Sequence, residues 1–171
     1  MYKTFDTKIS NVVQRMGKRA PWLWEFFAAW AFYAFIIAGV YFAWLMPFGA
    51  WLTTLALPVV GVWFATMLVQ FVVRRPRPSH TQNGFKLWVH TYSFPSAHAS
   101  TSFGCAVLLS AAALTTTPHI AAVLIPAVFV LASLIALSRI AVGVHYPSDV
   151  AAGIIFGTIL AGLFAFFVVL A

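Results

Sequence analysis

Long apolar stretches separated by short polar segments form the main pattern of this chain. Each stretch is close to the ~20 residues that a helix needs to cross the hydrocarbon core of a bilayer. The five stretches are residues 22–46, 51–73, 97–116, 119–138 and 148–171. Because the bilayer core holds no water for backbone N–H and C=O groups, segments that cross it are helical. The pattern therefore predicts an all-α membrane protein, a compact bundle of about five transmembrane helices.

The first twenty residues follow a different pattern. They hold five Lys/Arg residues, and Ile9, Val12, Val13 and Met16 recur at helical spacing as an apolar stripe. A basic amphipathic segment of this kind favours a helix that lies in the membrane interface. We expect one domain over residues 1–171, with six helices if this N-terminal one is counted.

Composition agrees with a membrane protein and narrows its partners. The 171 residues are 63% hydrophobic and 8% charged, a surface that a water-soluble domain could not cover. The net charge of +7 favours contact with anionic lipid headgroups in the bilayer, and the divided basic residues argue against nucleic-acid binding. A single cysteine, Cys105, excludes an intrachain disulfide and a thiol-based metal site. The sequence does not indicate whether the protein is a monomer or an oligomer.

Three polar clusters interrupt the apolar pattern, and counting the helices places all three on one side of the membrane. Ionisable groups at such positions are costly and indicate function. The clusters are Arg77-Pro78, Pro95-Ser96-Ala97-His98, and Ser138-Arg139 with His145 and Asp149. The long connection at 74–95 and the N-terminal segment fall on the same side.

The third cluster has the residues of an activated nucleophile. Pro147 suits the first turn of the last helix, which would place Asp149 in that turn and His145 just before it. A carboxylate can then accept a hydrogen bond from one imidazole nitrogen and leave the other as a free lone pair. Helix capping by Asp149 beside an interfacial His145 is the alternative.

The second cluster opens the third long helix. The N-terminus of a helix offers unpaired N–H groups that bind phosphate oxygens, and Ser96 adds a hydroxyl while Ala97 permits close approach. His98 could protonate a leaving oxygen. Arg77 and Arg139 suit phosphate through their forked donors. An ordinary helix cap and positive-inside anchoring are the alternatives for these residues.

Together the clusters resemble the three-part signature of the type 2 phosphatidic acid phosphatase (PAP2) superfamily. That signature is Lys-x6-Arg-Pro, then Pro-Ser-Gly-His, then Ser-Arg-x5-His-x3-Asp. The third part matches in full, whereas Ala97 replaces the usual glycine in the second and Gln70 replaces the lysine in the first. We expect Arg74 to replace that lysine in part, because a helix would place Gln70, Arg74 and Arg77 on one face.

The resemblance implies a metal-independent lipid phosphatase without a cofactor. His145 would form a phosphohistidine, Asp149 would orient it, and His98 would protonate the leaving group and then activate water. Phosphate oxygens would be held by Arg77, Arg139, Ser96 and Ala97, with Gln70 and Arg74 nearby. The chain also lacks a carboxylate cluster that could hold Mg²⁺.

The substrate that the resemblance favours is a lipid phosphate, above all undecaprenyl diphosphate, since the small size is similar to that of the bacterial undecaprenyl pyrophosphate phosphatases. Phosphatidylglycerophosphate, phosphatidic acid and lipid A 1-phosphate stay open. A membrane transport or structural protein with a degenerate site is the alternative of another class. Lys86, His80, His90 and Tyr92 are candidates for headgroup contacts in the 79–94 loop.

Two arguments disagree about the side of the membrane on which the site lies. All ten Lys/Arg residues fall on the side of the three clusters, which the positive-inside rule assigns to the cytoplasm. The resemblance instead implies an extracytoplasmic site in the cell (inner) membrane, where a carrier lipid would be recycled. We expect the extracytoplasmic side.

Overall fold

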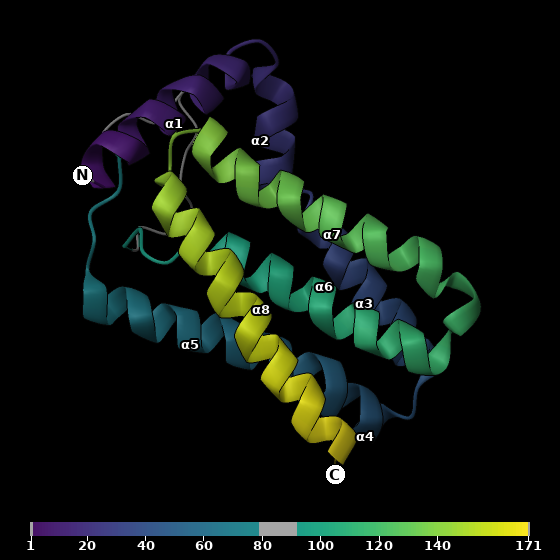
Figure 1. The fold of residues 1–171 in the computed structure, drawn as a ribbon. Coiled ribbons are helices and arrows are strands. Elements are labelled where there is room, and N and C mark those ends of the chain that lie inside the picture. Colours follow the sequence, from purple (N-terminus) through teal and green to yellow (C-terminus); the bar gives the residue numbers. More distant parts are fainter. Residues whose placement is uncertain (1, 79–91, 171) are drawn as a thin grey trace.

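The protein is described here by a computed structural model covering residues 2–78 and 92–170, and within these residues all regular structure is helical (Figure 1). Within the described residues, four continuous helical stretches are long and apolar enough to span a membrane, one of them, Phe48–Val73, made of two α-helices and the π-helical turn between them, and a bent helix pair brings the number to as many as five. This confirms the predicted all-α bundle. The elements are α1 (Tyr2–Gly17), α2 (Pro21–Ala29), α3 (Tyr33–Leu45), α4 (Phe48–Trp51), a π-helical turn (Leu52–Ala56), α5 (Leu57–Val73), α6 (Ala97–Thr116), α7 (Pro118–Ala141) and α8 (Pro147–Leu170).

Helix α6 is the centre of the bundle and lies between α5, α7 and α8 (Figure 1). In its most apolar stretch 61% of residues are buried, against 22–28% in the other three uninterrupted spans. Its sequence is rich in Ala, Ser and Thr, and small residues let neighbouring helices approach closely. The outer helices turn large apolar side chains outward, as a lipid-facing surface requires.

Helices α8 and α6 approach each other closely. A Cβ added at Gly157 would lie 2.0 Å from the backbone oxygen of Ser100, and one at Gly153 would lie 2.6 Å from that of Ser96. The hydroxyls of Thr66 and Ser100 are 2.7 Å apart and link α6 to α5. These contacts set the position of the first turn of α6 relative to α8.

The expected first span is broken in two. Residues 22–46 form α2 and α3, which meet at a 40° bend across residues 30–32. The carbonyl oxygen of Ala28, in the last turn of α2, accepts a hydrogen bond from the buried guanidinium of Arg139 at 2.7 Å. Carbonyls in the last turn of a helix have no partner within the helix, so the break supplies an acceptor for this cation.

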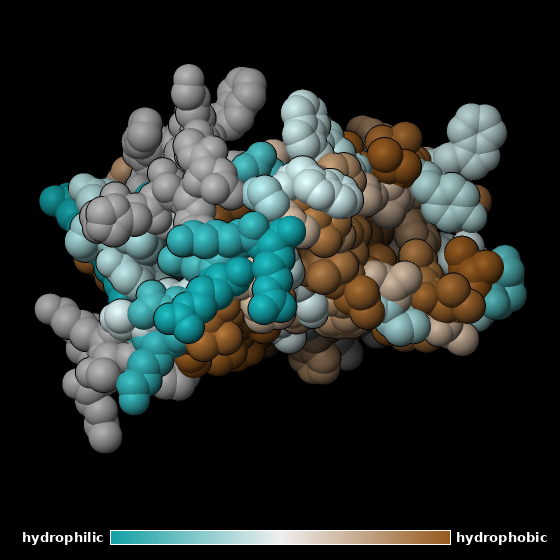
Figure 2. All heavy atoms as spheres, turned by 90° about the horizontal axis from the view of Figure 1, so that it is seen from above, coloured by the Kyte–Doolittle hydropathy of each residue, from teal (hydrophilic) through white to brown (hydrophobic). Residues whose placement is uncertain are grey.

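Helix α1 packs across the ends of α7 and α8. The predicted apolar stripe is divided: Val13 packs against the core, while Val12 and Met16 are 59% and 51% exposed. Gly17 lies against the backbone of Ala141. Figure 2 shows hydrophilic residues gathered toward one end of the molecule, with mainly hydrophobic residues over the rest of that face.

Candidate active site

The turn between α7 and α8 places His145 at the polar end of the bundle. Gly143 adopts a φ of 79°, which favours glycine, and the backbone N–H groups of Val144 and His145 both donate to the carbonyl of Arg139. Helix α8 then begins at Pro147, as predicted, with Asp149 in its first turn. Only 2% of His145 and none of Asp149 is exposed.

The two nitrogens of His145 have different partners. Nδ1 lies 2.8 Å from the carbonyl oxygen of Ser93, and because a carbonyl can only accept, Nδ1 carries the proton. Nε2 is left with its lone pair and lies 3.2 Å from Nη1 of Arg77. Burial lowers the pKa of His145 to about 4, and Arg139 and Arg77 act in the same direction while Asp149 opposes them. At neutral pH the imidazole is therefore uncharged and its Nε2 carries a lone pair.

Asp149 lies in the predicted turn, but its hydrogen-bond partners differ from the predicted one. Its Oδ2 is 3.7 Å from Nδ1 of His145, within ion-pair range but too far for a hydrogen bond. Oδ2 accepts instead from the backbone N–H of Tyr146 at 2.9 Å, and Oδ1 accepts from Arg75 at 2.6 Å. The carboxylate thus acts on the imidazole through its charge, and Ser93 holds the ring nitrogen.

The second cluster meets the third at the start of α6. The backbone N–H of Ser96 donates to the carbonyl of Asp149 at 2.9 Å, and the buried hydroxyl of Ser96 has no hydrogen-bond partner within residues 2–78 and 92–170. His98 is half-buried in the first turn, with its ring centroid 6.3 Å from that of Phe32. Arg139 and His145 are near enough to act on His98 electrostatically. Ala97, the first residue of α6, presents its backbone at the same place.

The first cluster contributes Arg77, which contacts His145, whereas Gln70 and Arg74 bond to backbone carbonyls of other residues. Gln70 is buried and its Nε2 donates to the carbonyl of Pro95 at 2.7 Å, so it supports the turn before α6. The expectation that Arg74 shares a helical face with Gln70 and Arg77 is wrong, because α5 ends at Val73 and Arg74 adopts a φ of 52°. Arg74 is exposed, and its Nε donates to the carbonyl of Phe71.

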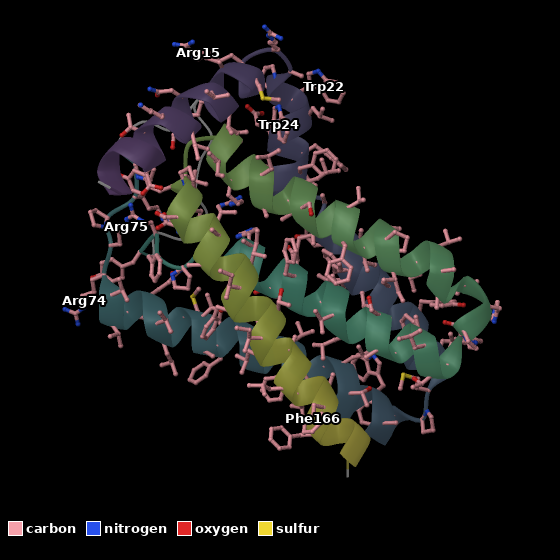
Figure 3. All side chains as sticks on the ribbon, viewed as in Figure 1. Arg15, Trp22, Trp24, Arg74, Arg75 and Phe166 are labelled. Carbon is pink, nitrogen blue, oxygen red and sulfur yellow. The ribbon has the colours of Figure 1, made fainter. Side chains whose placement is uncertain are left out.

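Sequence reasoning missed Arg75, which enters the site in place of Arg74. Figure 3 shows Arg74 pointing away from the bundle and Arg75 lying between α1 and the start of α8. Its partner Asp6 was missed as well, although an acid that is one of only three on such a chain is a usable signal. Ser93, which bonds to His145, and Ser148, which bonds to Arg75, are uncharged residues of a common type, and nothing in the sequence marks them.

The loop candidates fall largely outside the described residues: Lys86, His80 and His90 lie within 79–91. Tyr92 is described, and its ring packs edge-on against that of Phe71 at 6.0 Å. In the two described parts of the chain, no group of three or more His, Cys, Asp or Glu residues could hold a metal ion.

Comparison with known proteins gives matches in both sequence and fold. The model of the PAP2 superfamily matches residues 51–170. A decaprenylphosphoryl-5-phosphoribose phosphatase of Mycolicibacterium smegmatis is 42% identical over 90 residues, which are 52% of this chain and 44% of that protein. One of Mycobacterium tuberculosis is 40% identical over 92 residues, 53% of this chain and 46% of that protein. These matches span less than half the length of the curated relatives.

Two solved structures share the fold. The transmembrane PAP2 type phosphatidylglycerolphosphate phosphatase of Bacillus subtilis has a TM-score of 0.80 at 21% identity, covering 97% of this chain and 85% of that one. Aquifex aeolicus LpxE has a TM-score of 0.65 at 24% identity, covering 92% and 93%. At these identities the likeness is one of fold.

Proposed function

The chain belongs to the PAP2 superfamily, and we propose that it is a lipid-phosphate phosphatase that works through a phosphohistidine on His145. The observation that carries the proposal is the imidazole geometry. The proton on Nδ1 is held by Ser93, and the lone pair on Nε2 lies beside Arg77. A neutral, oriented imidazole next to a guanidinium is suited to attack a phosphorus whose oxygens that guanidinium binds.

The reaction takes two displacements. In the first, Nε2 attacks phosphorus, the bond from phosphorus to the leaving oxygen breaks, and His98 gives that oxygen its proton. In the second, His98 takes a proton from water, the water oxygen attacks phosphorus, and the bond from phosphorus to Nε2 breaks. Arg77 moves from Nε2 to a phosphate oxygen when substrate binds, and Arg139, the hydroxyl of Ser96 and the amide of Ala97 hold the other oxygens.

The substrate that we propose is a polyprenyl lipid bearing a terminal phosphate. The site lies at helix ends on the polar side of a lipid-facing bundle, so a headgroup can reach it while the tail stays in lipid. Two forms fit: undecaprenyl diphosphate, and a polyprenylphosphoryl sugar phosphate of the kind named for the mycobacterial relatives. Sequence identity of 40–42% to those relatives supports the second form.

The test measures phosphate released by the purified full chain in detergent, with EDTA present. The panel holds undecaprenyl diphosphate, decaprenylphosphoryl-5-phosphoribose, phosphatidylglycerophosphate, phosphatidic acid and lipid A 1-phosphate. We expect release from a polyprenyl lipid, lost in His145→Ala and kept in His119→Ala, since His119 is exposed in the first turn of α7, which begins at the end of the bundle away from the start of α8 (Figure 1). Release from the glycerolipids or lipid A alone would refute the polyprenyl assignment. No release from any lipid would support a non-catalytic membrane protein.

A quenched single turnover with lipid labelled in its terminal phosphate tests the intermediate. A phosphohistidine is a phosphoramidate, which acid hydrolyses and alkali spares. We expect such a label on the protein, more of it in His98→Ala and none in His145→Ala. Turnover without any labelled protein in His98→Ala would argue for direct attack by water.

We also propose that the site faces away from the cytoplasm. Arg75, Arg77 and Arg139 bond within the site, so they are weak topology signals. Arg19 lies exposed between α1 and α2 at the site end. A membrane-impermeant maleimide on intact cells should label Arg19→Cys and should reach His119→Cys only after permeabilisation. The reverse result would place the site in the cytoplasm.

A further inference from the structure

Asp6 is buried at the polar end of the bundle although it belongs to the N-terminal helix. Only 1% of it is exposed, and both of its carboxylate oxygens are bonded. Oδ2 accepts from Nη2 of Arg75 at 2.8 Å and from the hydroxyl of Ser148 at 2.7 Å. Oδ1 accepts from the backbone N–H of Ser148 at 3.0 Å. A side chain of α1 therefore bonds directly to the first turn of α8.

Arg75 links this carboxylate to the one that faces the nucleophile. Its Nη1 donates to Oδ1 of Asp149 at 2.6 Å and to the hydroxyl of Ser148 at 2.7 Å, while Nη2 donates to Asp6. The guanidinium carbon also lies 4.2 Å from the centroid of the Tyr146 ring. The planar fork of arginine can bond two carboxylates at once, which a lysine cannot do.

The charges in this chain of contacts alternate. Burial acts to raise the pKa of Asp6, but hydrogen bonds from Arg75 and Ser148 outweigh it and hold that pKa below its usual value. Asp6 is therefore ionised at neutral pH, and the set of Asp6, Arg75 and Asp149 has a net charge of −1. With Asp6 absent, Arg75 would neutralise Asp149, and positive charge developing on His145 would lose its counter-charge.

From this geometry we propose that Asp6 and Arg75 are positioning residues, and that α1 is a working part of the active site. Asp6 fixes Arg75, and Arg75 fixes the Asp149 carboxylate that faces Nδ1 of His145. The inference rests on the proposed function for its kinetic readout. A competing explanation is that Asp6 only fastens α1 to the bundle.

The first experiment compares kcat and KM of Asp6→Asn with those of Glu25→Gln. Glu25→Gln is the matched control, because Glu25 is the acid of the chain other than Asp6 and Asp149 and its change also replaces a carboxylate by an amide. Misplaced catalytic groups cost about 10- to 100-fold, and we expect kcat of Asp6→Asn to fall by that factor with little change in KM. Glu25→Gln should match the wild type. A kcat for Asp6→Asn equal to that of the wild type would overturn the proposal.

A double-mutant cycle separates positioning from fastening. If Asp6 acts through Arg75, Asp6→Asn should cost little further kcat once Arg75→Gln is in place. Gly17→Ala supplies the fastening control, because its Cβ would meet the Ala141 carbonyl and disturb α1 without touching Asp6. Full additivity in the cycle, or a kcat loss in Gly17→Ala equal to that in Asp6→Asn, would overturn the proposal. Arg75→Lys keeps the charge without the fork and should lose kcat even if Asp6→Asn fails to fold.

Orthovanadate, which adopts the five-coordinate geometry of a phosphoryl transition state, gives a readout that needs no lipid. We expect Asp6→Asn to bind vanadate about tenfold more weakly than the wild type and Glu25→Gln to bind it unchanged. Vanadate binding that depends on Asp6 in a protein inactive on every lipid would refute the lipid substrate and support the positioning role. Equal vanadate binding by Asp6→Asn and the wild type would refute the positioning role alone.

Discussion

Nδ1 of His145 lies 2.8 Å from the carbonyl oxygen of Ser93, so a backbone group fixes the tautomer of the proposed nucleophile. The carboxylate of Asp149, at 3.7 Å, contributes charge and leaves the ring proton to Ser93. Since Ser93 precedes α6 and His145 precedes α8, the tautomer depends on how these two helices pack. The close contact of Gly153 with the backbone of Ser96 holds that packing.

The first prediction concerns the protonation of His145. Burial lowers its pKa to about 4, so the imidazole should stay neutral, with its proton on Nδ1, from pH 8 down to about 5. The side-chain 15N shifts, assigned by comparison with His145→Ala, measure this directly. Titration near 6.5, where a solvated imidazole titrates, or a proton on Nε2 at pH 7 would contradict the geometry.

The second prediction concerns Arg77. Its guanidinium lies 3.2 Å from Nε2 and disfavours a charged imidazole, so Arg77→Ala should raise the pKa of His145. The same change removes a donor to the phosphate, and we expect kcat/KM to fall by about 10²–10³. The measurement pairs kinetics with the 15N titration. An unchanged or lower pKa of His145 in Arg77→Ala would contradict the expected effect of the guanidinium on the imidazole.

The third prediction separates Gln70 from Arg74. Gln70→Leu leaves the buried carbonyl of Pro95 without its donor, which should cost about 1–3 kcal/mol of stability and lower kcat. Arg74→Ala removes an exposed side chain and should change stability by less than about 0.5 kcal/mol. Thermal unfolding in detergent and kcat/KM measure both. A larger loss of kcat/KM in Arg74→Ala would restore the interpretation that Arg74 replaces the family lysine.

Sequence patterns predicted those parts of the structure that depend on residues close together in the sequence. Apolar length gave the bounds of α6 at Ala97–Thr116, and proline preference gave the start of α8 at Pro147. Counting spans brought His98 and His145 to one end, where the structure also has them. These features follow from hydropathy and from the chemistry of helix ends, which each segment carries by itself.

Other parts of the site depend on contacts between distant segments, which no local pattern encodes. The bond between Asp6 and Ser148 joins residues 142 positions apart. The bend between α2 and α3 is linked to Arg139, 111 positions from its acceptor Ala28. Helical spacing continued past Val73 pointed to Arg74 as the arginine of the site. The helix instead ends at Val73, because Arg74 adopts a left-handed backbone conformation that the sequence pattern did not reveal.

The fourth prediction tests the packing on which the site depends. A Cβ at Gly157 would lie 2.0 Å from the Ser100 carbonyl oxygen, so Gly157→Ala must push α8 away from α6. Overpacking of this kind costs about 1–3 kcal/mol or more, and we expect a lower Tm together with lost activity, because His145 and Ser93 move apart.

Gly162 provides the matched control in the same helix, since a Cβ added there meets nothing within 4 Å. Gly162→Ala should gain about 0.5–1 kcal/mol from better helix propensity and keep wild-type kcat. Thermal unfolding of both variants in the same detergent decides the matter. If Gly157→Ala is as stable and active as Gly162→Ala, then α6 and α8 do not meet at Ser100. The hydrogen bond between the Ser93 carbonyl and Nδ1 of His145, which depends on that packing, would then be contradicted as well.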